Sequence, residues 1–148
     1  MLQLAKNSNV YEGIIGVKKR ISLERIDAEL FGEIPVPKTP ITQYDDCVYF
    51  INEKDESFGG SNSDAIKICN FVETKEYNKY PILVHSENEL LDGWHRLYAA
   101  TLRGEKEVDV IYPTKRTKLL SHLLKNSGFY SDLDNIVEEN CEKFECLD

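Results

Sequence analysis

Five consecutive residues near the middle of the chain, Asp92-Gly93-Trp94-His95-Arg96, bring together the side chains that could do chemistry. A glycine at a strand-to-helix corner lets the backbone come close to a ligand, and the N–H groups of the first helical turn then face an anion. We therefore expect Gly93, Trp94, His95 and Arg96 to bind phosphate. Asp92 could hold Mg²⁺ or orient a substrate hydroxyl, and His95 could share in catalysis.

The residues around this corner predict the elements that position it. Residues 81–112 read as strand, turn, strand, corner, a helix stopped at Gly104 and a closing strand. Ser63 is a suitable N-cap for a preceding helix that extends to about Thr74. Because β-rich runs alternate with capped helices, we expect an α/β (α+β) fold with a small mixed β-sheet and flanking helices.

The N-terminal third gives weaker patterns. Residues 12–17 and 21–26 predict one or two short strands, separated by a basic turn at residues 18–20. Residues 48–51 predict a further strand. The three prolines within residues 32–41 indicate a loop, and the polar, glycine-containing stretch 53–62 indicates a second loop that could serve as a lid.

Two amphipathic helices are predicted after Pro113, one that ends near Gly128 and one that begins at about Asp132. We therefore divide the chain into a domain at residues 1–113 that carries the phosphate-binding corner and a C-terminal helical extension at residues 114–148 that packs on the same domain.

By residue type and order, the segment around Asp92-Gly93-Trp94-His95-Arg96 resembles the ParB/sulfiredoxin superfamily. The likeness is to small ParB-like domains that carry Asp-Gly-x-His-Arg, then Ala-Ala and a helix-ending glycine. It covers residues 61–113 well and residues 17–31 loosely. The resemblance implies a nucleotide (ATP, ADP or CTP) at this corner, with Mg²⁺.

Members of that superfamily use the nucleotide differently, so the resemblance implies a ligand class more firmly than a reaction. Partition proteins bind and hydrolyse CTP, sulfiredoxins use ATP to repair an over-oxidised cysteine, and an archaeal relative phosphorylates free serine. Trp94 stands where sulfiredoxins place their nucleophilic cysteine, and Trp94-His95-Arg96 replaces the Glu-Arg-Arg of partition proteins. Glu29 loosely matches the acidic base of the serine kinase.

Each residue of the corner also has a structural interpretation. Asp92 is a common type of helix N-cap, a role compatible with Mg²⁺ binding. Trp94, the only tryptophan, could pack in the core or stack on a base. His95 could be a satisfied polar residue at a strand end, and Arg96 could form a surface ion pair.

The charge of the chain bears on its partners. Eighteen basic and 26 acidic residues give a net charge of −8, and residues 131–148 alone contribute −6. An acidic excess repels a phosphate backbone, and no helix-turn-helix is apparent in the sequence, so we expect no duplex DNA partner. The sequence has no leader and no long apolar run, which predicts no membrane partner and a cytoplasmic location.

The four cysteines, Cys47, Cys69, Cys141 and Cys146, are too scattered for a metal knuckle. A reducing compartment then predicts free thiols, with disulfides as the minor alternative.

The leading hypothesis is an enzyme that binds a nucleotide and Mg²⁺ and transfers a phosphoryl group to a small-molecule acceptor or hydrolyses the nucleotide, with Glu29 as base. The alternative is a non-catalytic, nucleotide-gated module whose acidic C-terminal helix or 53–62 loop recognises another protein. A ParB-like nuclease is a third interpretation, disfavoured by the acidic charge and the lack of a carboxylate-rich metal cluster.

Overall fold

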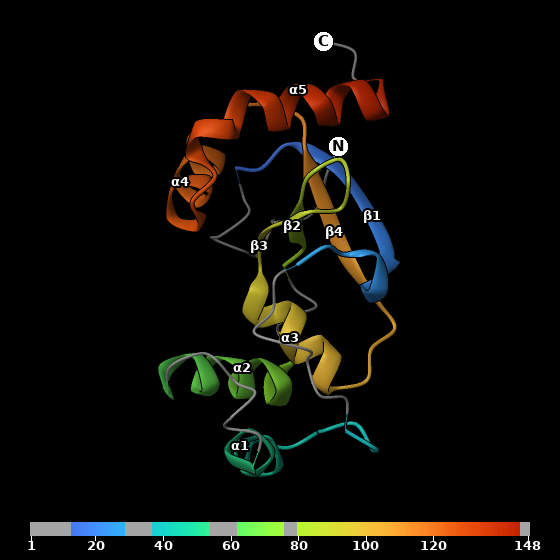
Figure 1. The fold of residues 1–148 in the computed structure, drawn as a ribbon, viewed down its shortest axis with the longest axis vertical. Helices are drawn as coiled ribbons and strands as arrows, with labels where there is room; N and C mark the ends of the chain where they lie inside the picture. Colours follow the sequence, from blue (N-terminus) through green and yellow to red (C-terminus); the bar gives the residue numbers. More distant parts are fainter. Residues whose placement is uncertain (1–12, 29–36, 54–61, 76–79, 146–148) are drawn as a thin grey trace.

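A four-stranded mixed sheet lies at the centre of the protein, as seen in a computed structural model that describes residues 13–28, 37–53, 62–75 and 80–145 (Figure 1). The strands, in the spatial order β1-β4-β2-β3, are β1 (Gly16–Ser22), β4 (Glu107–Pro113), β2 (Ile82–Val84) and β3 (Leu90–Asp92). Strand β4 pairs antiparallel with β1 and parallel with β2, while β2 pairs antiparallel with β3. The predicted mixed α/β architecture is therefore confirmed.

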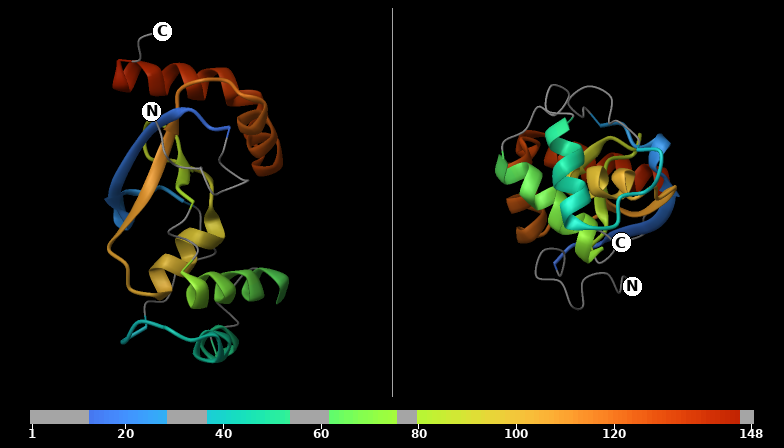
Figure 2. Two further views of the ribbon diagram at one scale, coloured as in Figure 1. Left: turned by 180° about the vertical axis from the view of Figure 1, so that it is seen from behind. Right: turned by 90° about the horizontal axis from the view of Figure 1, so that it is seen from below.

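Helices cover both faces of the sheet. On one side α3 (Trp94–Leu102), α2 (Asn62–Thr74) and α1 (Tyr44–Glu53) follow one another in successive layers (Figures 1 and 2). On the other side lie α4 (Lys118–Ser127) and α5 (Leu133–Phe144). Two short 3-10 turns complete the regular structure that is described, η1 (Leu23–Arg25) and η4 (Tyr130–Asp132).

The alternation of side chains along β2 and β4 builds two hydrophobic clusters. Ile82 and Val84 of β2 face the helices α1 to α3, whereas Leu83 between them faces α4 and α5. Strand β4 repeats the pattern, with Val110 on the first face and Ile111 on the second. Because both faces are buried, the central strands are apolar at nearly every position.

The elements predicted for residues 81–112 are all present, in the predicted order. Gly104 follows the end of α3 with a φ of +77°, and Gly128 caps α4 with a φ of +88°. The C-terminal helix begins at Leu133, next to the predicted Asp132. Within the described residues, no helix has the length and apolar character that a bilayer crossing requires.

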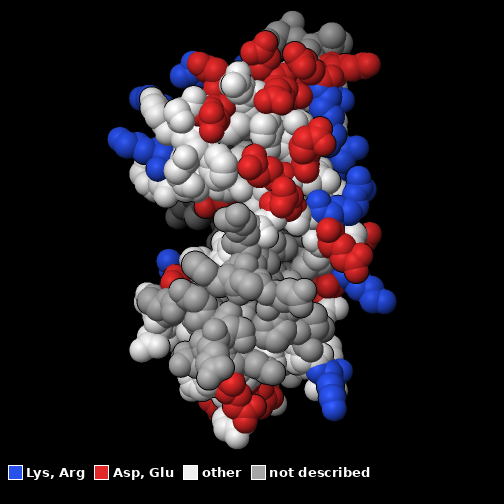
Figure 3. All heavy atoms as spheres, viewed as in Figure 1, with Lys and Arg blue, Asp and Glu red and all other residues white. Residues whose placement is uncertain are grey.

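Two predictions for the N-terminal third are wrong. The basic residues at 18–20 lie inside one continuous strand, β1, and not in a turn. They are tolerated there because Arg20 pairs with Asp109 and Glu107 at 3.3 and 3.6 Å, and Lys18 lies 3.9 Å from Asp109. Strand β1 is an edge strand of the sheet, and Figure 3 shows basic side chains beside acidic ones on that side of the protein, at the right of the view.

Residues 48–51 belong to helix α1 and not to a strand. A short apolar run does not distinguish the two, and here Cys47 and Ile51, one helical turn apart, are the residues that become buried. Of the expected loops at residues 32–41 and 53–62, residues 32–36 and 54–61 lie outside the described residues. Residues 37–41 form no helix or strand, as their prolines predict, whereas Glu53 and Asn62 belong to α1 and α2.

The expectation of free thiols is also wrong for two of the four cysteines. Cys47 of α1 and Cys69 of α2 form a disulfide, and both are fully buried. Cys141 lies outside this disulfide and its thiol donates to the carbonyl of Thr114 at 3.2 Å. The two cysteines meet because α1 packs against α2. Their separation of 22 residues in the sequence does not reveal this contact.

Candidate functional site

The corner between β3 and α3 is built on Gly93. Its φ of +112° and ψ of 24° lie in a region that residues with a side chain rarely adopt. A Cβ at this position would also lie 3.0 Å from Nη2 of Arg96 and 3.2 Å from Cγ1 of Ile82. Glycine is therefore needed here both for the backbone torsion and for close packing.

The predicted N-cap role of Asp92 is wrong, because Gly93 occupies the N-cap position and no side chain caps the helix. The N–H of Gly93 donates instead to the Asp92 carboxylate. The first backbone bond of α3 runs from the N–H of Leu97 to the carbonyl of Gly93, at 2.9 Å. Asp92 thus stands just before the positive end of the helix dipole.

A cavity of about 690 Å³ opens at this corner. Four segments contribute its walls: residues 27–28 after η1, helix α2, the β3–α3 corner with residues just before β3, and residues 127–129 at and after the end of α4. Figure 3 shows the surface hollowed on the left, between the region of α4 and that of α2. The described residues that line it are Asp27, Ala28, Lys67, Phe71, Glu89, Leu90, Leu91, Asp92, Gly93, Trp94, His95, Arg96, Ser127 and Phe129.

Arg96 reaches the cavity wall, but most of its side chain is buried, with 8% exposed. Its Nη1 donates to the carbonyls of Tyr80 and Pro81, each at 3.0 Å, and its Nη2 donates to Asp92 at 3.4 Å. Burial lowers the pKa of Arg96 to about 9, so the guanidinium is charged at neutral pH. Arg96 therefore ties the chain entering β2 to the end of β3, and it positions the Asp92 carboxylate.

Asp92 has an environment suited to proton transfer. Burial raises the pKa of its carboxyl, against the lowering effects of the neighbouring His95 charge and of the Gly93 N–H bond. Its side chain is 29% exposed and lines the cavity, so a ligand can reach it. A carboxyl with a raised pKa in a cavity is a candidate general acid or base.

His95 is oriented by a residue that the sequence analysis did not single out. Its Nε2 lies 2.7 Å from Oδ1 of Asp64, in the first turn of α2, so a ring N–H donates to this carboxylate. The edge of the Trp94 ring also contacts the imidazole, with 5.0 Å between ring centroids. A carboxylate that accepts a hydrogen bond from an imidazole in this way sets the orientation of the ring.

Helix α2 supplies further residues of the cavity that were missed, Lys67 and Phe71. Asp64, Lys67 and Phe71 are spaced at i, i+3 and i+7, which places them along one side of a helix. The sequence signal was present in this spacing. It could not be interpreted without knowing that α2 packs beside α3.

The predicted packing role of Trp94 is confirmed in part, and its predicted stacking on a base stays a prediction. It is partly buried against the cluster of α1 to α3, and its ring lies 5.3 Å from that of Tyr98. It also lines the cavity, as do Phe71 and Phe129. Aromatic side chains from α2, α3 and the connection between α4 and η4 therefore border the same space.

The predicted base Glu29 lies outside the described residues. Two other carboxylates line the cavity, Asp27 and Glu89, and a parallel β-bridge holds their backbones side by side. The N–H of Asp27 donates to the carbonyl of Asn88, and the N–H of Leu90 donates to that of Asp27, both at 2.8 Å.

The described residues contain no group of three or more His, Cys, Asp or Glu side chains arranged to hold a metal ion. A dedicated protein cage for Mg²⁺ is therefore not found in this part of the chain. Mg²⁺ commonly takes only one or two carboxylates and completes its shell with substrate phosphates and water. Asp92, with Asp27 and Glu89 in the same cavity, fits an ion that arrives with a phosphate ligand.

Comparisons with known proteins returned no match to a protein-family model, to a curated protein or to a solved structure.

Proposed function

We propose that this protein has a ParB/sulfiredoxin-like fold and binds a nucleotide (ATP, ADP or CTP) with Mg²⁺ in the cavity beside α3, where it transfers or hydrolyses a phosphoryl group. One observation carries the proposal. A single cavity brings together the N-terminal turn of α3, Lys67, His95, which Asp64 orients, and a carboxyl of raised pKa, Asp92.

The phosphates would lie between the start of α3 and α2. The positive end of a helix dipole favours an anion, Lys67 adds a cationic donor from α2, and His95 lines the same cavity at the start of α3. Arg96 contributes its charge to the field, while Nη1 stays on the Tyr80 and Pro81 carbonyls. Arg96 is therefore proposed as a support of the phosphate site more than as a direct ligand.

The aromatic residues Trp94, Phe71 and Phe129 support the nucleotide over a bare phosphate. A base can stack on such rings, and a volume of about 690 Å³ lies within the usual range for small-molecule sites. Duplex DNA is not the proposed ligand, because the net charge is −8 and acidic side chains gather over one face (Figure 3).

Asp92 is the proposed proton acceptor. As an acceptor hydroxyl or water attacks the terminal phosphorus, its proton passes to the Asp92 carboxylate and the bond to the leaving phosphate oxygen breaks. A carboxylate whose pKa is raised holds that proton better than an ordinary one. Mg²⁺, when bound with the nucleotide, would neutralise phosphate charge. His95, held by Asp64, would stabilise charge on the transferred group.

A thermal-shift panel of ATP, ADP, CTP and inorganic phosphate, each with and without Mg²⁺, tests the binding. A ligand at a hundred times its dissociation constant stabilises the native state by about 2.7 kcal/mol. We expect a nucleotide with Mg²⁺ to raise the unfolding temperature, and Lys67→Met to weaken its affinity about tenfold. Lys118→Met, which changes an exposed lysine outside the cavity, is the matched control.

Phosphorus NMR of the ligand that raises the unfolding temperature most then separates catalysis from binding. New phosphate signals that disappear in Asp92→Asn support the enzyme. Binding without turnover under all acceptors tried would favour the gated module, and no binding in the whole panel would refute the proposal.

A further inference from the structure

Helix α2 carries site residues on one side and a disulfide on the other. We propose that the Cys47–Cys69 disulfide is a positioning element of the site, which holds α2 so that Asp64 stays hydrogen-bonded to His95. The inference deepens the proposed function and rests on it for the role of His95. It concerns two cysteines that are not among the residues lining the cavity.

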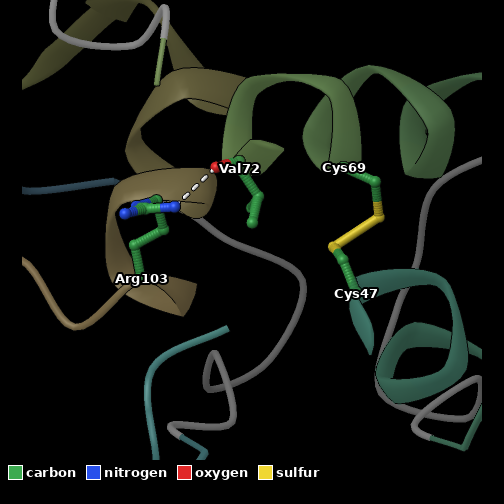
Figure 4. The surroundings of a disulfide bond; sticks show 4 residues. All are labelled: Cys47, Cys69, Val72 and Arg103. Atoms are coloured by element: carbon green, nitrogen blue, oxygen red, sulfur yellow. Dashed lines mark hydrogen bonds between the residues drawn. A yellow bond between two sulfur atoms is a disulfide. The ribbon is translucent and has the colours of Figure 1, made fainter. Parts of the chain in front are cut away.

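The spacing along α2 separates the two sides. Asp64, Lys67 and Phe71 share the cavity side, whereas Cys69 lies two residues from Lys67, which is about 200° around an α-helix. The disulfide therefore attaches α2 on the side that faces away from the ligand. Figure 4 shows the bridge passing from α2 to α1, with the two sulfurs between the helices.

A second attachment holds α2 to α3. Nη1 of Arg103, at the end of α3, donates to the carbonyl of Val72 at 2.9 Å (Figure 4). Val72 and Ile68 are fully buried in the same cluster. Both features act on the C-terminal half of α2, whereas Asp64 lies in its first turn, about 12 Å from Val72 along the axis.

The disulfide completes a ring of contacts that begins and ends on α3. The N–H of Ile41, just before α1, donates to the carbonyl of Leu102 at the end of α3. Helix α1 then connects to α2 through Cys47–Cys69, and α2 returns to the start of α3 through Asp64 and His95. Loss of the disulfide opens this ring at a covalent link, so α2 gains freedom to roll about its axis while the Arg103–Val72 bond still holds its C-terminal half.

A small roll is enough to break the pair. Side-chain atoms lie about 5–6 Å from a helix axis, so a roll of about 20° moves a carboxylate by about 2 Å. The His95–Asp64 distance of 2.7 Å would then exceed hydrogen-bond range. Because both cysteines are fully buried, the disulfide acts as a permanent brace and not as a surface switch.

The test compares the wild-type protein with the double variant Cys47→Ser/Cys69→Ser, with Cys141→Ser as the control that removes a thiol outside the bridge. The first readout needs no ligand: the Nε2–H proton resonance of His95, which the bond to Asp64 shelters from exchange. We expect this resonance in the wild type and in Cys141→Ser. We expect its loss in Asp64→Asn and in the double variant, while the backbone spectrum stays dispersed.

The second readout is a double-mutant cycle with ADP and Mg²⁺ as probe. Asp64→Asn should lower affinity about tenfold in the wild-type background and less than about twofold in the disulfide-free background, because the pair is already broken there.

An equal loss in both backgrounds, or a His95 resonance that persists without the disulfide, overturns the inference. A double variant that does not fold also overturns it, because the bridge would then stabilise the whole protein and not this pair. Failure of ADP to bind the wild type would count against the proposed function, and the His95 resonance would still decide the positioning role.

Discussion

The two walls of the cavity differ in how they are built. The β3–α3 wall is one continuous segment, Asp92 to Arg96, fixed from behind by the bonds of Arg96 to Tyr80 and Pro81. The α2 wall comes from a separate helix, whose Asp64 lies 31 residues before His95. The first wall gives the site its shape through local geometry. The second supplies a carboxylate and a lysine that depend on helix packing, so the two walls should respond differently to substitution.

The largest expected effect is on the β3–α3 wall, at Arg96. Arg96→Met leaves the Tyr80 and Pro81 carbonyls without their donor and the half-buried Asp92 without its cation. Loss of one partner of a buried charged group costs about 3–5 kcal/mol. We expect a matching fall in the free energy of unfolding, measured by urea titration.

Arg116→Met is the control for Arg96, because Arg116 is 60% exposed and pairs with the exposed Asp134 at 2.7 Å. Its substitution should change stability by less than about 0.5 kcal/mol. Arg96→Met with near wild-type stability and weakened nucleotide binding would instead make Arg96 a direct phosphate ligand, as the sequence alone predicts.

A smaller loss is expected at Gly93. Gly93→Ala places a Cβ against Arg96 and Ile82 at a φ of +112°, which should cost about 2–3 kcal/mol. Gly128→Ala is a matched control, since its φ is +88° and nothing lies within 4 Å of the new Cβ. It should cost only about 1 kcal/mol. Equal losses from the two alanines in thermal unfolding would show that close packing at the corner contributes nothing.

The pH dependence of stability should reveal Asp92. Its folded pKa is raised by burial, so the native state binds more protons than the unfolded state as pH rises from the ordinary value of 3.8 through the raised pKa. Stability of the wild type relative to Asp92→Asn should therefore be greatest at acid pH and fall as pH rises through that window. A difference that grows with pH would mean that the folded pKa is lowered.

The subtlest effect links the two walls. The positive charge of His95 lowers the pKa of Asp92, against the larger effect of burial. His95→Gln should therefore raise the pKa of Asp92 further, followed by carbon NMR of the carboxyl. No change in that titration would show that the charge on His95 does not reach Asp92.

The contrast between a wall built from one continuous segment and a wall built by helix packing also explains what the sequence could predict. The strand, corner and helix of residues 81–112 follow from local patterns, because glycine and apolar spacing act within a few residues. The pairing of Lys18 and Arg20 with β4 and the helical state of residues 48–51 depend on distant neighbours, so local patterns failed there.

Packing between helices decides the rest of the site. Asp64, Lys67 and the Cys47–Cys69 bridge acquire their roles only where α1, α2 and α3 meet. No spacing within one element predicts such contacts. The buried role of Arg96 was hidden for the same reason, since its partners precede it by 15 and 16 residues.

Chemical-shift mapping with ADP and Mg²⁺ on the isotopically labelled protein tests the central claim most directly. We expect the amides of Gly93 to Arg96 and those of Asp64, Lys67 and Phe71 to shift together along one saturation curve, because both walls enclose one ligand. Shifts on the β3–α3 wall alone, or shifts confined to other surfaces such as the acidic helix α5, would contradict it.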